Sequence, residues 1–188
     1  MKIFITLATL LFTTLASAGI LIEPQFGYIL SNKYSGTIGL SGPSSITLPA
    51  DYKSTGPEYG ARLGYQVLGL MGGLNYGHST GKSKNSDGTT DDLKATNIGA
   101  FVGYSAPILV RAWLAYNFSS KTTIDTSSIK GNSTELGLGF TGIPFLSVNF
   151  IYRMYKYTEI TDLGSTWTAT NFNPKEIELA ISAPFNLF

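Results

Sequence analysis

The sequence predicts an all-β protein, an eight-stranded antiparallel up-and-down barrel that spans a membrane. Eight segments alternate apolar and polar residues with the two-residue period of a β-strand. Four long polar connections also alternate with three short ones. The long ones cover 31–55, 79–92, 119–132 and 160–173, and the short ones lie around 68–69, 106–107 and 143–144. Long loops on one side, short turns on the other and an even strand count are typical of transmembrane barrels.

Residues 1–18 have the pattern of a secretory signal peptide, which leaves 19–188 as a single barrel domain. Lys2 precedes the apolar run 3–15, and Ala16, Ser17 and Ala18 form a small-residue cleavage site. The run is too short for a membrane-spanning helix, which needs about 20 residues. The alternative, a short buried helix, leaves the small-residue ending unexplained.

The composition excludes several classes of function. The chain has no cysteine, so disulfides, thiol catalysis and cysteine-ligated metals are excluded. It has 13 basic and 12 acidic residues, a balance that lacks the electrostatic footprint of a nucleic-acid-binding protein. After the first 18 residues there is no apolar stretch long enough for a transmembrane helix.

The first four predicted strands are 20–30, 58–67, 70–77 and 97–105. In 20–30 the even-numbered residues from Ile20 to Leu30 are apolar or aromatic, and Glu23, Gln25 and Gly27 share the opposite parity. In 58–67 the odd-numbered positions from Tyr59 to Val67 take the apolar role. The next two strands follow the same rule, with Phe101 as an exception on the polar parity. These apolar parities are expected to face lipid.

The last four predicted strands are 110–118, 135–140, 146–155 and 176–182. Their apolar parities run from Val110 to Phe118, from Leu136 to Phe140, from Leu146 to Met154 and from Ile177 to Ile181. Apart from charged residues, most of the opposite positions hold glycine, amide or hydroxyl side chains. All eight segments therefore hold one phase for at least five residues.

The polar parity collects eight charged residues, which we expect to form a polar network in the lumen. They are Glu23, Glu58, Arg62, Arg111, Glu135, Arg153, Glu176 and Glu178. Because unpaired buried charges are very costly, these groups must pair with one another or contact water. A soluble barrel of the lipocalin type would have an apolar interior and a charged outer face. The observed pattern is the reverse.

Two interpretations of the charged interior stay open. An eight-stranded barrel encloses a lumen that side chains can fill, which favours a plug of ion pairs and hydrogen bonds. The alternative is a proton or ion path, or a narrow channel for small solutes. Neither interpretation requires a cofactor, a metal ion or a catalytic group, and none is predicted.

Aromatic residues gather near the predicted strand ends. On the lipid-facing parity they are Tyr28, Tyr59, Tyr76 and Phe118 towards the long loops, and Tyr65, Tyr104 and Phe185 towards the short turns. Rings at these levels are expected to form the two aromatic girdles of a membrane barrel. The long loops themselves contain Tyr34, Tyr52, Trp167 and Phe172, which we expect to be exposed and able to contact an unidentified surface ligand.

The signal peptide, the eight amphipathic strands, the loop rhythm and the terminal Phe188 together resemble the small OmpA/OmpX-type outer-membrane barrels of bacteria, over the whole of 19–188. The resemblance implies an outer-membrane location, periplasmic termini, extracellular long loops and contacts with outer-membrane lipid and lipopolysaccharide. It also implies insertion by the barrel assembly machinery, which recognises a C-terminal strand ending in an aromatic residue, here Phe188. Phe188 is out of phase with Ile177 and Phe185, and a bulge at Pro184 would reset the register.

Two weaker patterns suggest chemistry in the loops. His78 and the adjacent serine, with Glu159 or Asp92 as the acid, are the candidates for a lipid hydrolase, but neighbouring residues on a strand point to opposite faces. Asp87, Asp91 and Asp92 offer oxygen ligands for calcium, but lysines flank them. We therefore predict a non-enzymatic barrel that contributes to envelope integrity or presents its loops for adhesion or recognition.

Overall fold

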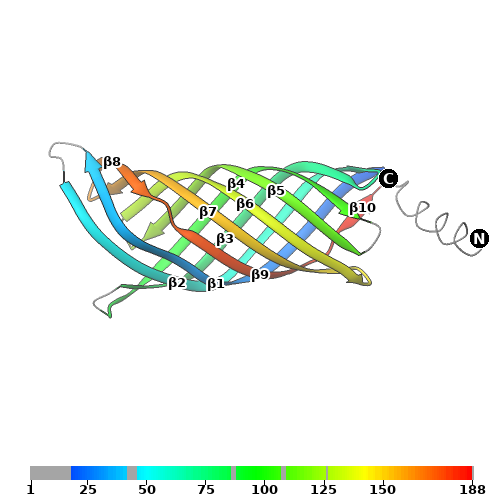
Figure 1. Ribbon diagram of the computed structural model, residues 1–188, viewed down its shortest axis with the longest axis horizontal. Helices are drawn as coiled ribbons and strands as arrows, with labels where there is room; N and C mark the ends of the chain where they lie inside the picture. Colours follow the sequence, from blue (N-terminus) through cyan, green and yellow to red (C-terminus); the bar gives the residue numbers. More distant parts are fainter. Residues whose placement is uncertain (1–17, 42–45, 86–87, 107–108, 126, 188) are drawn as a thin grey trace, which may run out of the picture.

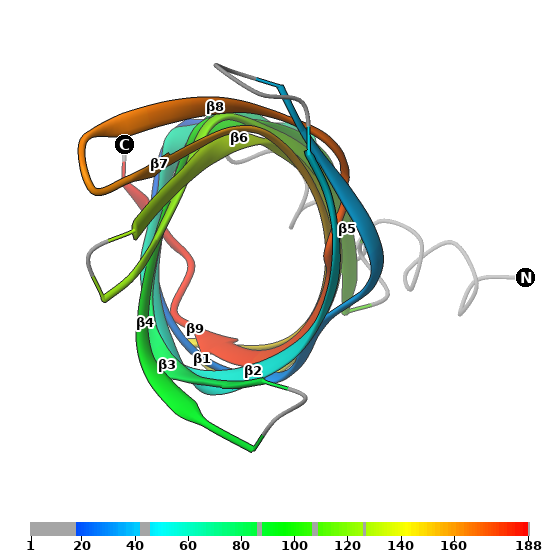
Figure 2. The ribbon, with the colours of Figure 1, turned by 90° about the vertical axis from the view of Figure 1, so that its left-hand side faces the viewer.

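The computed structural model describes residues 18–41, 46–85, 88–106, 109–125 and 127–187, without the side chains of 36, 46–50 and 85. These residues form a closed antiparallel barrel, seen from the side in Figure 1 and along its axis in Figure 2. The strands are β1 (Gly19–Ser41), β2 (Ile46–Val67), β3 (Leu70–Asn85), β4 (Thr90–Ala106), β5 (Val110–Ile124), β6 (Ser127–Ile143), β7 (Leu146–Asp162), β8 (Ser165–Phe172), β9 (Lys175–Ser182) and β10 (Phe185–Leu187). Among the described residues, no helix is long and apolar enough to cross a membrane.

The ring has eight positions, because β8, β9 and β10 share the last one. Both β8 and β9 pair with β7 and with β1, and β10 continues along β1. The ladder is interrupted at Pro174 and Pro184, since proline has no N–H group to donate. The predicted eight-stranded up-and-down barrel is thus confirmed. The bulge considered at Pro184 is not present: Ser182 pairs with Gln25 and Phe185 with Ile22, so the register with β1 is unchanged.

The alternation read from the sequence decides which residues face outwards. The apolar parity of every predicted strand lies on the outer surface, where side chains such as Phe26, Leu63 and Val102 are more than half exposed. The exception on the polar parity, Phe101, is buried inside the barrel, in contact with an apolar cluster that includes Trp113. An outer wall of exposed apolar side chains is the surface that lipid acyl chains require.

The long connections were predicted as loops, and this was wrong for most of their residues. β1 runs on to Ser41, β2 begins at Ile46, and paired strands likewise occupy most of 79–92, 119–132 and 160–173. We call this part of the barrel the extension; Figure 1 shows it at the left, opposite the short turns. Its threonine residues are polar but favour β-strands, so polarity alone did not distinguish a loop from a solvated strand.

Bulges invert the inner and outer faces between the lipid-facing wall and the extension. In β1 the register shifts between Ile29 and Asn32, so that odd-numbered residues point inwards before the shift and even-numbered ones after it. A second bulge in β5, between Asn117 and Ser120, has the same effect. Beyond the bulges the inward positions hold both apolar residues such as Tyr34 and Ile38 and polar ones such as Asn32 and Thr122.

Stagger between the strands decides which inner residues become neighbours. The cross-strand row that starts at Leu21 passes through Glu135, Arg153 and Glu176 in β6, β7 and β9, and returns to β1 at Asn32. It returns eleven residues further along β1 than it began, which is the offset that tilted strands need to close a barrel. This offset decides which residues of β1 and β2 lie beside the charged residues of β9.

Candidate functional site in the barrel interior

The structure places all eight charged residues of the predicted lumen network inside the barrel. They are Glu23 on β1, Glu58 and Arg62 on β2, Arg111 on β5, Glu135 on β6, Arg153 on β7, and Glu176 and Glu178 on β9, each at most 2% exposed. Five carboxylates therefore face three guanidinium groups. Because a charge at this depth is costly without a partner, the arrangement depends on how these groups pair.

Arg153 is the centre of the larger group, which we call the Arg153 cluster. Its guanidinium donates to Glu58 at 2.9 and 3.1 Å and to one oxygen of Glu135 at 3.0 and 3.1 Å. It also donates to Glu178 at 3.3 Å and to Glu176. Arg153 thus contacts four carboxylates, two of which are its cross-strand neighbours. Glu58 reaches it from β2, three positions away around the ring.

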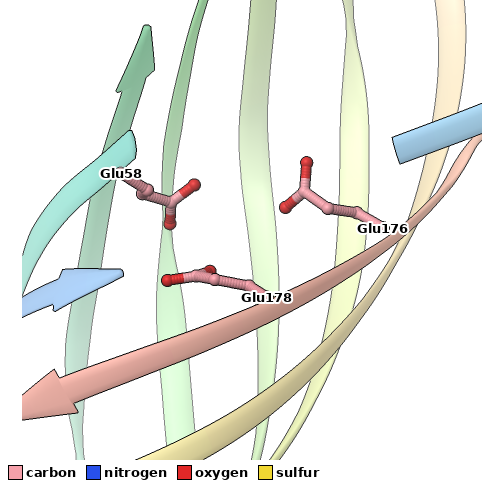
Figure 3. A group of neighbouring side chains, drawn as sticks. All are labelled: Glu58, Glu176 and Glu178. Carbon is pink, nitrogen blue, oxygen red and sulfur yellow. The ribbon is translucent and has the colours of Figure 1, made fainter. Parts of the chain in front are cut away.

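Three carboxylates of this cluster point towards one another, as Figure 3 shows. Oxygen atoms of Glu58, Glu176 and Glu178 lie within 4.8 Å of one another, a grouping that could offer ligands to a hard cation. All three already accept hydrogen bonds from Arg153. The Arg153 guanidinium therefore already supplies a positive charge to each of these three carboxylates.

A second group lies closer to the short turns. Arg111 donates to Glu23, and it also donates to Asn149 and Ser182 at 3.0 Å each. Arg62 lies 3.7 Å from Glu23 and donates to Gln25 at 2.5 Å. Neutral side chains therefore supply much of the hydrogen bonding here. The sequence interpretation placed Gln25, Asn149 and Ser182 on the inner face but did not assign these neutral residues to the network.

Trp113 connects the two groups, a role that the sequence did not reveal. The guanidinium carbon of Arg62 lies 3.8 Å from the centre of the indole ring, the distance of a cation–π contact. The indole N–H donates to Glu135 at 2.9 Å. Gly137 is opposite Trp113 on β6, and a Cβ added there would lie 2.0 Å from the ring. The signal in the sequence was a large aromatic residue, Trp113, on the inner parity of one predicted strand and a glycine, Gly137, on the inner parity of the next.

Aromatic side chains are buried together in the interior of the extension. Tyr34, Tyr155, Tyr157 and Phe172 are buried in one cluster, with ring centres of neighbouring pairs 4.8 to 5.3 Å apart. Tyr52 packs partly buried against it. We had expected Tyr34, Tyr52 and Phe172 to be exposed loop residues, and this was wrong. The bulge in β1 turns Tyr34 inwards, and its hydroxyl donates to the carbonyl of Asn171 at 2.7 Å.

The remaining candidates are not assembled into a site. His78 is on the outer face, where its Nδ1 is hydrogen-bonded to Thr96 at 2.9 Å and its ring lies beside Tyr59. Ser79 is buried on the opposite face of β3, so the two are not a nucleophile and base pair. Glu159 pairs with Lys130 at 2.9 Å. Asp87, Phe188 and residues 1–17 of the predicted signal peptide lie outside the described residues.

Comparisons with known proteins agree on the architecture. No protein-family model matches the chain, and no curated protein sequence matches it. Among solved structures, the outer membrane protein OprG from Pseudomonas aeruginosa is similar with a TM-score of 0.52 and 13% identity, covering 92% of this chain and 98% of that one. Ail, the attachment invasion locus protein of Yersinia pestis, is similar with a TM-score of 0.51 and 12% identity, covering 89% and 99%.

These likenesses, at low identity, establish the fold. The chain has the eight-stranded architecture of the small bacterial outer-membrane barrels, as the resemblance in the sequence implied. Its exposed apolar wall and charged interior are those of an integral outer-membrane β-barrel.

Proposed function

We propose that the protein is a sealed, non-enzymatic barrel of the bacterial outer membrane, which contributes to the integrity of the envelope and presents the extension for recognition at the cell surface. The observation that carries the proposal is the filling of the interior. Three sets of side chains are buried in succession along the barrel: the group around Arg111, the Arg153 cluster and the aromatic cluster of the extension. A solute or ion would have to displace ion pairs and packed rings to pass.

The orientation is part of this proposal. The extension carries the polar, solvated outer surface, and in membrane barrels of this class the longer segments are extracellular and the short turns periplasmic. We therefore place both ends of the barrel domain in the periplasm. Insertion by the barrel assembly machinery through Phe188 remains a prediction from the resemblance.

The first experiment is planar-bilayer recording of the purified protein. We expect no steady single-channel openings, because the charged groups of the Arg153 cluster are bonded to one another across the interior. Flotation of the same preparation with lipid vesicles, together with different gel migration before and after boiling, serves as the control for folded insertion. Steady openings from inserted protein would contradict the sealed barrel and favour a narrow channel for small solutes or ions.

The absence of catalysis is tested at His78, the only histidine of the chain. We expect His78→Ala to leave the lipid composition of the envelope unchanged, because its neighbouring serine lies on the opposite face of the strand. Lipid mass spectrometry of cells that express either variant measures this. A change that Thr96→Ala does not reproduce would indicate chemistry at the imidazole and not a lost hydrogen bond.

A further inference from the structure

The two kinds of basic residue are completely separated in the described structure. All three arginines of the chain lie inside the barrel, whereas every lysine of residues 18–187 is exposed on the outer face of the extension. These lysines are Lys33, Lys53, Lys82, Lys84, Lys94, Lys121, Lys130, Lys156 and Lys175. The outer surface next to the lipid-facing wall is therefore encircled by flexible ammonium groups.

Four of these lysines form one continuous cross-strand row, which we call the lysine row. Lys175 on β9 pairs in register with Lys33 on β1, Lys33 pairs with Lys53 on β2, and Lys53 pairs with Lys84 on β3. Directly opposed side chains have Cβ atoms about 4.5–5.5 Å apart, and like charges in this position are destabilising. That spacing is well within the screening length of about 8 Å at physiological ionic strength.

The row is not neutralised by the protein's own acidic groups. Among the described residues none of its four lysines forms an ion pair, and the exposed pair of the extension joins Lys130 to Glu159 instead. Asp51 lies two residues from Lys53 on the same face of β2, and Asp92 is opposite Lys82 and not opposite the row. None of the directly opposed pairs in the row contains a carboxylate, so an external anion that lies across the four lysines would reduce their mutual repulsion.

The row begins at the edge of the lipid-facing wall and rises away from it. Lys175 is two residues from the lipid-facing Ile177, and Lys33 is three residues from Leu30. Lys53 and Lys84 are six and eight residues from the lipid-facing Tyr59 and Tyr76. The row spans about 14 Å across four strands, and with strands tilted by about 40° it climbs roughly 9 Å above the bilayer edge.

We propose that the lysine row binds the phosphate groups of lipopolysaccharide in the outer leaflet. A glycerophospholipid has its phosphate at a single depth, whereas lipopolysaccharide carries phosphates at the headgroup level and further anionic groups on the sugars above it. Only the second matches a row of cations that climbs from the bilayer edge. This inference rests on the proposed function, because it needs the extension to be extracellular.

The test compares two variants with the same change in net charge. The row variant replaces Lys33, Lys53, Lys84 and Lys175 by serine, and the control variant replaces Lys82, Lys94, Lys121 and Lys156, which are exposed lysines on β3, β4, β5 and β7 that are not directly opposed to one another. Each full-length barrel is placed in phosphatidylcholine nanodiscs with increasing amounts of lipopolysaccharide, and binding of a fluorescent lipopolysaccharide is measured. We expect the row variant to bind about tenfold more weakly or worse, and the control variant to change by about twofold at most.

Further arms identify the chemistry. Enzymatic dephosphorylation of the lipopolysaccharide should weaken its binding to the wild type by as much as the four row substitutions weaken binding of the intact lipid. Raising the salt concentration should also weaken binding to the wild type. Phosphatidylglycerol and inorganic phosphate are the competitors, and neither should displace the lipid at equal concentration of phosphate. Equal losses in the two quadruple variants, or displacement by either competitor, would overturn the assignment to this row and this lipid.

Two controls separate the possible failures. In neutral detergent without lipopolysaccharide, the row variant should be at least as stable as the wild type, because like-charge repulsion has been removed; a less stable variant would show that the row has a structural role instead. Labelling of lysines on intact cells with a membrane-impermeant amine reagent tests the orientation alone. Binding in nanodiscs without labelling on cells would contradict the proposed orientation, and with it the assignment of the row to the outer leaflet.

Discussion

Replacing Arg153 by methionine is expected to lower the free energy of unfolding by about 3–5 kcal/mol, or to prevent folding, because it leaves buried charges without their partner. Four carboxylates, those of Glu58, Glu135, Glu176 and Glu178, are paired with this one guanidinium. Methionine fills a similar volume but donates no hydrogen bond. Urea unfolding in phospholipid vesicles, followed by gel migration without boiling, measures the effect.

The matched control for this variant is Lys156→Met on the same strand, where the side chain is exposed on the outer face. We expect its free energy of unfolding to stay within about 0.5 kcal/mol of the wild type. Adding Glu176→Gln and Glu178→Gln to Arg153→Met should recover part of the loss by removing two uncompensated charges. An Arg153→Met barrel as stable as the wild type would show that the cluster is not held together by this arginine.

Replacing Trp113 by alanine is expected to cost about 3–5 kcal/mol, the range found when a large buried aromatic side chain is removed. The side chain is only 2% exposed and belongs to the apolar cluster with Leu21, Met71 and Phe101. Its removal also takes the indole donor from Glu135 and the ring from Arg62. Far-ultraviolet circular dichroism during urea unfolding is the suitable measurement, because the substitution itself changes the fluorescence.

Trp167→Ala provides the comparison, since Trp167 is the other tryptophan of the chain and lies half-buried in the extension. We expect a loss of about 1 kcal/mol or less there. Trp113→Phe should fall between the wild type and Trp113→Ala, because it keeps a ring in the cluster but has no N–H group for Glu135. Similar losses of unfolding free energy in Trp113→Ala and Trp167→Ala would mean that the Trp113 ring, between Arg62 and Glu135, has no special structural role.

The lipid-facing part of the barrel was predictable to the level of single residues. Alternation placed the even-numbered residues from Ile20 to Leu30 outwards and Glu23 inwards, and the structure has the same assignment. A strand that separates lipid from a polar interior must alternate, so its two faces can be read from the sequence alone. The same reasoning located the charged interior before any partner was known.

The extension and its aromatic cluster were not predictable in the same way. Neither face of these strands is consistently apolar or consistently polar. A solvated strand of serine and threonine also has the composition of a loop. A single bulge residue in β1 then reverses the facing of Tyr34. Bulges are decided by pairing with neighbouring strands, so a pattern read along one strand does not locate them.

In the lipid-facing part of the barrel, the sequence by itself determined which side chains lie inside and which face lipid, because alternation is a local property of each strand. Only the tertiary structure decided which inner charges meet. Arg153 contacts Glu58 from the far side of β1 because the ring closes with an offset of eleven residues, and Lys33 lies between Lys53 and Lys175 for the same reason. That offset is a property of all the strands together, and no segment of the sequence contains it.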